Sequence, residues 1–167
     1  MSAHELVDLL DASGRVIGVT TRADIRARKL PHRCVYILVF NRQGKLFIHQ
    51  RTASKDVFPS YWDVTIGGVV AASESFDQAA VREGGEELGV HLKPEPLFPF
   101  SFTDERTTAF AHVYRAIHDG PFQLQAEEIV QGQFINGNDI ALFAAKQSFC
   151  PDGLEVWRQY QKRKDEG

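Results

Sequence analysis

The order of apolar and polar residues along the chain predicts several strands and three or more helices. Residues 34–40 are continuously apolar and rich in β-branched and aromatic side chains, which indicates a strand buried on both faces. A turn at 41–44 follows this strand. Further strands are expected at 45–51, at 63–70 (interrupted by Gly67-Gly68), and at 97–102, 108–117 and 129–135.

The beginning of the chain predicts a β-hairpin over residues 5–20, with a turn at 12–15. Residues 21–30 are charged and form one or two helical turns that end before Pro31. Near the end, two helices are expected over 139–146 and 152–164.

A helix is expected from Phe76 to Leu88, because Ser73 or Ser75 can cap its start and Gly89 can end it. Its apolar side is formed by Phe76, Ala80, Val81 and Leu88.

Mixed strands with helices on either side predict an α/β (α+β) sandwich with a mixed central sheet, an N-terminal β-hairpin and C-terminal helices. A length of 167 residues suits a single domain. We expect residues 1–30 to be an N-terminal hairpin extension and residues 31–167 to be the core.

Composition narrows the class of protein. The chain is 43% hydrophobic and 25% charged, with a net charge of -3, which argues against nucleic-acid binding through the whole surface. Cys34 and Cys150 are far apart, so thiols in a reducing compartment are expected. The N-terminus lacks the pattern of a signal peptide, and no apolar run reaches the roughly 20 residues of a membrane span. A soluble cytoplasmic protein is expected.

The chemistry is concentrated in the helix after the glycines. Glu83, Glu86 and Glu87 are spaced so that all three carboxylates share one helical face. Like charges at this spacing repel each other in water, whereas Mg²⁺ would bind to them. Arg82 can pair with a carboxylate one turn away or fold back on Glu74. A solvated acidic face is the plain interpretation of Glu86 and Glu87 alone, but the whole pattern favours a site.

Residues 68–90 resemble the Nudix box, Gly-x5-Glu-x7-Arg-Glu-U-x-Glu-Glu-x-Gly-U, in which U is a bulky apolar residue. Val90 satisfies the final U. The fixed positions are Gly68, Glu74, Arg82, Glu83, Glu86, Glu87 and Gly89. Over roughly residues 5–160 the chain is similar to the Nudix branch beside type I isopentenyl-diphosphate isomerase. This wider likeness is carried by residues 5–8, 32–33, 50–52 and 58–59.

Two positions depart from the family pattern. Gly84 replaces the apolar U residue and is followed by Gly85, and each glycine costs a helix about 1 kcal/mol relative to alanine. We expect the carboxylates to be held less rigidly as a result. Ser73 precedes Glu74 where many members have glycine, which is a mild change.

The resemblance implies an enzyme that acts on phosphoric anhydrides. It cleaves the diphosphate bond of a nucleoside diphosphate linked to another group, with Mg²⁺ or Mn²⁺ as cofactor. Glu83, Glu86 and Glu87 are the implied metal ligands, with the Gly68 carbonyl as a further one. Arg82 and Glu74 are implied as the supporting ion pair.

The general base is not fixed by the motif. Glu87 is the first candidate and Glu128, at the start of a strand, is the second. Glu128 and its neighbour Glu127 are otherwise exposed loop acids. Asp104 and Glu105 are weaker candidates.

Substrate recognition is less clearly encoded. Arg51, Lys55 and Arg106 are candidates for phosphate contacts, unless they are structural or solvated. Phe102, Tyr61 and Trp62 could stack on a base, although aromatic residues next to strands are more often in the core. His32 and His49 are expected to be packing residues. The expected partner is a small-molecule diphosphate, first of all a nucleotide, with no nucleic acid and no membrane; a homodimer through the hairpin edge is left open.

Two other functions remain as alternatives. Isopentenyl-diphosphate isomerisation needs a cysteine just after the strand that leads to the motif, and residues 63–68 contain none. A non-catalytic module that binds a nucleotide or diphosphate is the second alternative, because Gly84-Gly85 weakens the motif helix.

Overall fold

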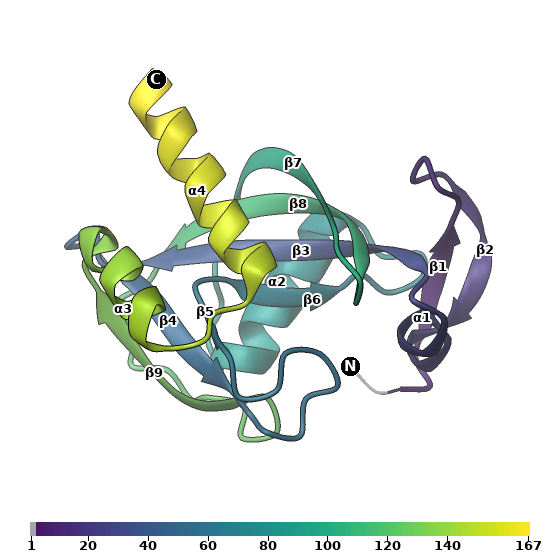
Figure 1. The fold of residues 1–167 in the computed structure, drawn as a ribbon, viewed down its shortest axis with the longest axis horizontal. Coiled ribbons are helices and arrows are strands. Elements are labelled where there is room, and N and C mark those ends of the chain that lie inside the picture. Colours follow the sequence, from purple (N-terminus) through teal and green to yellow (C-terminus); the bar gives the residue numbers. More distant parts are fainter. Residues whose placement is uncertain (1–2) are drawn as a thin grey trace.

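The long apolar strand is the centre of the structure (Figure 1). In the computed structural model, which describes residues 3–167, this strand is β3 (Pro31–Phe40), and it starts earlier than predicted. It pairs in parallel with β8 (Thr108–Ile117) and antiparallel with β6 (Ile66–Val69). The other strands of this seven-stranded mixed sheet are β4 (Leu46–Arg51), β5 (Trp62–Asp63), β7 (Glu95–Thr103) and β9 (Ile129–Ile135).

The sheet opens on one side of β3. β3 and β4 are paired only where Phe40 meets Leu46. Over residues 34–37 of β3, the neighbouring strand is β6 instead. β4 continues away from β3 and pairs instead with β5 and β9. This divergence separates two strands that are consecutive in sequence and leaves room between them for polar side chains.

The expected interruption of the strand at Gly67-Gly68 is wrong. Both glycines are paired within β6, Gly67 with Tyr36 and Gly68 with Val35. An ideal Cβ at Gly67 would lie 1.9 Å from the Val35 carbonyl oxygen. Glycine is therefore required by a close backbone approach and not by a break in the strand.

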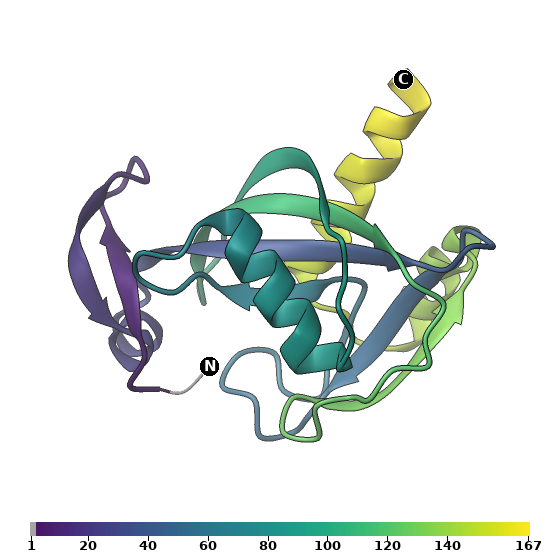
Figure 2. The same ribbon diagram turned by 180° about the vertical axis from the view of Figure 1, so that it is seen from behind.

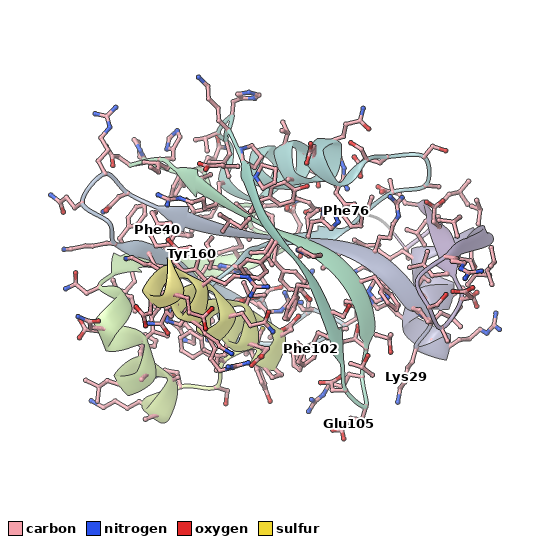
Figure 3. All side chains as sticks on the ribbon, turned by 90° about the horizontal axis from the view of Figure 1, so that it is seen from above. Lys29, Phe40, Phe76, Phe102, Glu105 and Tyr160 are labelled. Atoms are coloured by element: carbon pink, nitrogen blue, oxygen red, sulfur yellow. The ribbon has the colours of Figure 1, made fainter. Side chains whose placement is uncertain are left out.

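Helices cover the sheet on both faces, as Figures 2 and 3 show. α2 (Phe76–Leu88) lies on one face, and α3 (Ile140–Lys146) and α4 (Pro151–Glu166) lie on the other. A short 3₁₀ turn, η1 (Gly137–Asp139), leads into α3. The predicted sandwich of helices around a mixed sheet is confirmed.

The motif helix has clear start and stop signals. Ser75 caps it in a capping box with Gln78, which decides between the two predicted serines. Ser73 instead has a positive φ of 66° in the preceding turn. Gly89 ends the helix in the left-handed conformation, with a φ of 68°.

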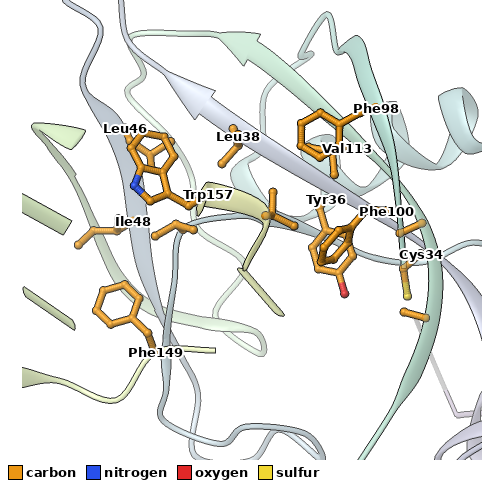
Figure 4. Packing of buried hydrophobic residues seen from close by; sticks show 14 of the residues in the cluster. Cys34, Tyr36, Leu38, Leu46, Ile48, Phe98, Phe100, Val113, Phe149 and Trp157 are labelled. Carbon is orange, nitrogen blue, oxygen red and sulfur yellow. The ribbon is translucent and has the colours of Figure 1, made fainter. Parts of the chain in front are cut away.

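The apolar core has two parts, one on each face of the sheet. Figure 4 shows the larger part, where Leu38, Leu46 and Val113 pack towards Trp157 of α4 and Phe98 of β7. The side of α2 that faces the sheet buries Ala79, Ala80, Leu88 and also Gly84. Val81, which was expected on this side, is only partly buried.

The N-terminal hairpin is a separate two-stranded sheet formed by β1 (Leu6–Leu10) and β2 (Val16–Thr21), followed by α1 (Arg22–Arg28). It is attached to the core, because Val7 and Ile25 are 1% exposed and belong to the larger apolar cluster. An ion pair of 2.6 Å joins Asp8 Oδ2 to Arg33 Nη2.

Two further expectations have a structural outcome. Cys34 and Cys150 are free and buried, in agreement with the prediction of thiols. Among residues 3–167, no helix is both long and apolar enough to cross a membrane.

Candidate functional site

Arg82 links the start of the motif to the carboxylates at its end. Its Nε and Nη2 donate to the two oxygens of Glu74 at 2.8 and 2.9 Å, and its Nη1 donates to Glu83 at 2.9 Å and Glu86 at 3.3 Å. Nη2 also donates to the Val69 carbonyl at 3.1 Å. The two arrangements predicted as alternatives for Arg82 are therefore present together. The guanidinium fixes the loop before α2 against the helix.

These hydrogen bonds shift the pKa values of Glu74 and Arg82 so that both charged forms are favoured. Burial acts to raise the pKa of Glu74, but the hydrogen bonds from Arg82 and from the Ala71 N–H outweigh it and lower that pKa. Hydrogen bonding to Glu74 raises the pKa of Arg82. Both groups therefore remain charged at neutral pH, and the ion pair between them persists there.

Glu83 and Glu87 are carboxyl groups in a buried position, 5% and 8% exposed. Burial raises the pKa of both, and for Glu87 the nearby charges of Glu83 and Glu128 add to the effect. Glu87 accepts a hydrogen bond of 3.1 Å from the Gly67 N–H. Glu86 lies on the exposed side of the helix. Keeping Glu83 and Glu87 ionised in this buried position therefore costs free energy, and a bound cation would offset that cost.

A pocket of about 70 Å³, which we call the outer pocket, lies beside these acids. Side chains of both charges line it. The acidic residues are Glu83, Glu86, Glu87 and Glu128, with Gly68 among the other lining residues. The basic residues are Arg22, Arg26, Arg51 and Lys55. The fold thus gathers residues from α1, β4, β6, α2 and the region before β9 around one small space.

The predicted site residues are not equally placed. Lys55 forms an ion pair with Glu128. Arg51 lines the outer pocket but donates to the carbonyls of Val57 and Phe58, so it also holds the loop between β4 and β5. Sequence reasoning missed Arg22 and Arg26, because nothing in their spacing links them to a motif some sixty residues later.

Arg106 lies outside the residues that line the outer pocket. Its guanidinium carbon is 5.0 Å from the centroid of the Phe58 ring, and its Nη1 is 3.5 Å from Asp104. Asp104 and Glu105 are in the same β7–β8 turn, and Figure 3 shows Glu105 at its tip, away from α2. The weaker base candidates are therefore not brought to the motif carboxylates.

A second space of about 80 Å³, the inner cavity, adjoins the outer pocket where β4 diverges from β3. The two spaces share Arg26, Arg51, Gly67, Gly68 and Glu87 as lining residues. The deeper wall carries polar groups that sequence reasoning did not connect: Tyr36, Asp63, Thr65 and Asp152. A polar interior next to the outer pocket offers hydrogen bonds to part of a bound molecule.

His32 and His49 line the inner cavity and are 2% and 3% exposed. Burial lowers the pKa of His32 to about 4 and of His49 to about 3, so both are uncharged at neutral pH. Trp62, considered as a base-stacking residue, packs in the core with its ring centroid 5.0 Å from that of Phe143.

Comparison with known proteins identifies the family. Residues 30–151, which include β3, β6 and α2, match the family model of the NUDIX domain. The chain belongs to the Nudix family. Nudix hydrolases cleave pyrophosphate bonds in general, and the resemblance to the Nudix family is confirmed.

Curated relatives match nearly the whole chain. The Nudix hydrolase SCO1686 of Streptomyces coelicolor is 39% identical over 93% of this chain and 88% of its own length. The Nudix hydrolase PA4841 of Pseudomonas aeruginosa is 39% identical over 95% of both chains. The Nudix hydrolase YfcD of Escherichia coli K12 is 33% identical over 98% of this chain and 90% of its own.

Solved structures give the same fold. DR0079 from Deinococcus radiodurans has a TM-score of 0.81 and 31% identity, and the match covers 93% of this chain and 98% of that one. The NUDIX domain of Shewanella oneidensis NrtR, solved with ADP ribose, has a TM-score of 0.65 and 21% identity over 86% of this chain and 99% of that one. The second likeness shows the fold alone.

Nudix hydrolases generally use divalent metals such as Mg²⁺ or Mn²⁺. Within residues 3–167, no three His, Cys, Asp or Glu side chains converge as ready ligands of one ion. Glu83 and Glu86 are instead bound by Arg82. The donors present are carboxylate oxygens, which Mg²⁺ and Mn²⁺ prefer. An ideal Cβ at Gly68 would lie 2.7 Å from Glu83 Oε1, so glycine leaves the backbone open beside this carboxylate. The residues fit a hard divalent cation.

Proposed function

We propose that this Nudix protein cleaves the diphosphate bond of a nucleoside diphosphate linked to another group, with Mg²⁺ or Mn²⁺ bound at Glu83, Glu86 and Glu87. One observation carries the proposal: the motif carboxylates and four cationic side chains line the same small pocket. A diphosphate together with a divalent ion matches this lining, because the ion satisfies the acids and the phosphate oxygens satisfy the cations.

Each motif residue has a defined task in this proposal. Glu83, Glu86 and Glu87 hold the ion, with the Gly68 carbonyl as a further donor. Arg82 and Glu74 keep the loop and the helix in register through the bidentate pair described above. When bound, the ion supplies charge neutralisation at phosphorus and an acidified water.

Glu87 is the first candidate for the general base and Glu128 remains the second. Glu87 is buried, lies in the motif and lines the outer pocket, which places its carboxylate beside a bound diphosphate. Glu128 lines the same pocket, but its carboxylate forms an ion pair with Lys55. Comparing the pH dependence of turnover in Glu87→Gln and Glu128→Gln would assign the role.

The nucleotide part of the substrate is supported by a likeness in fold. The NrtR domain was solved with ADP ribose, which is a nucleoside diphosphate linked to a second group. The polar lining of the inner cavity provides hydrogen-bonding partners for a base or a sugar.

The isomerase alternative is disfavoured by the sequence, because residues 63–68 contain no cysteine.

The test is phosphate release from a panel of nucleotides with Mg²⁺ or Mn²⁺. Wild type is compared with Glu86→Gln and Glu87→Gln, and Glu105→Gln is the control because Glu105 is exposed in the β7–β8 turn. We expect both motif variants to lose at least a hundredfold in rate and the control to keep it. Hydrolysis that survives both motif substitutions would refute the metal site. Tight metal-dependent nucleotide binding without hydrolysis of any substrate would favour the non-catalytic module.

A further inference from the structure

The N-terminal extension supplies part of the outer pocket. Arg22 and Arg26 lie one turn apart on α1 and line the same pocket as Glu83, Glu86 and Glu87. Both arginines precede residue 30, where the match to the NUDIX domain begins. The family motif therefore faces two cations that come from outside the matched domain.

α1 holds these side chains in a defined place. Thr21 caps the helix by accepting a hydrogen bond of 3.1 Å from the Asp24 N–H, and Ile25 anchors it in the core at 1% exposed. Residues four apart on a helix share a face, so this anchoring turns Arg22 and Arg26 together towards the pocket.

The other two cations that line the outer pocket already have ion-pair or hydrogen-bond partners. Lys55 is paired with Glu128, and Arg51 donates three hydrogen bonds to carbonyl oxygens. Among residues 3–167, Arg22 and Arg26 have Asp56 as their one shared ion-pair partner, at 3.3 and 3.8 Å. These distances are long for charge-assisted hydrogen bonds.

Arg26 has unused hydrogen-bonding capacity. Its Nε is buried and finds no hydrogen-bond partner among the residues that the structure describes. The side chain is 22% exposed and lines both the outer pocket and the inner cavity. A buried guanidinium donor without an acceptor is costly, and an anion at the junction of the two spaces would satisfy it.

We propose that Arg22 and Arg26 form an anion site that binds the phosphate chain of the substrate in the pocket that the motif carboxylates also line. The proposal rests on the diphosphate-cleaving function proposed above and identifies the residues that hold the anion. Arginine suits the task, because its planar fork matches two oxygens of a phosphate. Asp56 occupies the fork in part and is displaced or shared when the phosphate binds.

Binding of inorganic diphosphate in the presence of Mg²⁺, measured by titration calorimetry, tests the site without requiring turnover. We expect Arg26→Gln to weaken binding at least tenfold and Arg22→Gln to weaken it severalfold. Arg28→Gln is the matched control, because Arg28 is on the same helix but exposed and paired with Asp24. It should bind diphosphate as wild type does.

Asp56→Asn separates anion binding from a purely structural role. If Arg26 only holds the loop through Asp56, then Asp56→Asn will reproduce the loss seen in Arg26→Gln. If Arg26 binds phosphate, removing the competing carboxylate will leave diphosphate binding unchanged or tighter. Mn²⁺ binding alone should be the same in wild type, Arg26→Gln and Asp56→Asn.

Unchanged diphosphate binding in Arg26→Gln, or an equal loss in Asp56→Asn, overturns the proposal. Should Arg26→Gln fail to fold, Arg26→Lys and Arg22→Gln carry the same comparison, and Arg26→Lys should keep part of the affinity. On a hydrolysed nucleotide, Arg26→Gln should raise KM about tenfold and change kcat less than twofold. Glu86→Gln should lose kcat, so that failure of the anion site and failure of the proposed function give different results.

Discussion

Leu92 fills the space that a side chain at Gly84 would need. An ideal Cβ at Gly84 would lie 2.7 Å from Leu92 Cδ1, and Leu92 is 1% exposed. The missing apolar residue of the motif is thus replaced by one that follows the helix. This packing argues against a loosely held helix, because the turn that bears Glu83 and Glu87 is still anchored to the core.

The Gly84–Leu92 contact predicts a coupled pair of substitutions. Gly84→Leu should lower the free energy of unfolding by about 2 kcal/mol through overpacking, and Leu92→Ala by about 3 kcal/mol through a cavity. The double variant should lose less than the sum by at least about 1 kcal/mol, as measured by urea denaturation.

Gly85 provides the control for that pair. Its ideal Cβ has only the Val90 carbonyl oxygen near it, at 3.9 Å, and the residue is exposed. Gly85→Ala should therefore stabilise the protein by about 1 kcal/mol through helix propensity alone. Additive effects of Gly84→Leu and Leu92→Ala would contradict the packing explanation.

The bidentate hydrogen bonding of Arg82 to Glu74, the Arg82–Glu74 fork, predicts that a positive charge alone at position 82 is not sufficient for stability or activity. Arg82→Lys keeps the charge but has three N–H donors in place of the five hydrogen bonds that Arg82 donates, so the free energy of unfolding should fall by about 1–3 kcal/mol. Nucleotide hydrolysis should fall as well. Arg158→Lys is the control, because the Arg158–Glu155 pair lies on the surface and should matter little. Equal behaviour of the two variants would show that the fork is dispensable.

A divalent ion should stabilise the folded protein. Mn²⁺ at a hundred times its dissociation constant should add about 2.7 kcal/mol to the free energy of unfolding, visible as a higher melting temperature. Glu87→Gln removes a buried charge but keeps an acceptor for the Gly67 N–H, so it should melt higher than wild type without metal and gain little from Mn²⁺. A full metal shift in Glu87→Gln would exclude this residue as a ligand.

His49 predicts a loss of stability in acid. Burial, helped by the charges of Arg51 and Lys55, lowers the pKa of His49 to about 3. In the unfolded chain it is near 6.5, so the unfolded state binds the proton first as pH falls. The contribution of His49 is therefore complete above pH 6.5 and is lost as pH falls from 6.5 towards 3, by about 2 kcal/mol at pH 5. His49→Phe should flatten this part of the curve of unfolding free energy against pH. An unchanged slope would contradict the assignment.

Local signals made much of the fold predictable. β3 was expected because its apolar run is continuous, and α2 because a capping serine and a terminal glycine bracket it. The hairpin and the C-terminal helices were found for similar reasons. In each case the determining interactions join residues a few positions apart, which a single sequence displays directly.

Close approaches between distant segments were not predictable in this way. The two glycines of β6 were interpreted as a break, yet Gly67 is required because the Val35 carbonyl passes close to it. Nothing near residue 67 in sequence shows which strand will pair there. Likewise, nothing in the sequence around Gly84 shows that Leu92 occupies the space beside it.

The sequence by itself determined that Glu83, Glu86 and Glu87 lie on one helix beside a glycine-containing strand, since helical spacing is a local property. Only the tertiary structure decided what faces them. Arg26 reaches the outer pocket because Ile25 anchors α1 in the core, and the inner cavity exists because β4 leaves β3 after a single pairing. Such placements depend on long-range packing, in which each segment finds its position only against all the others.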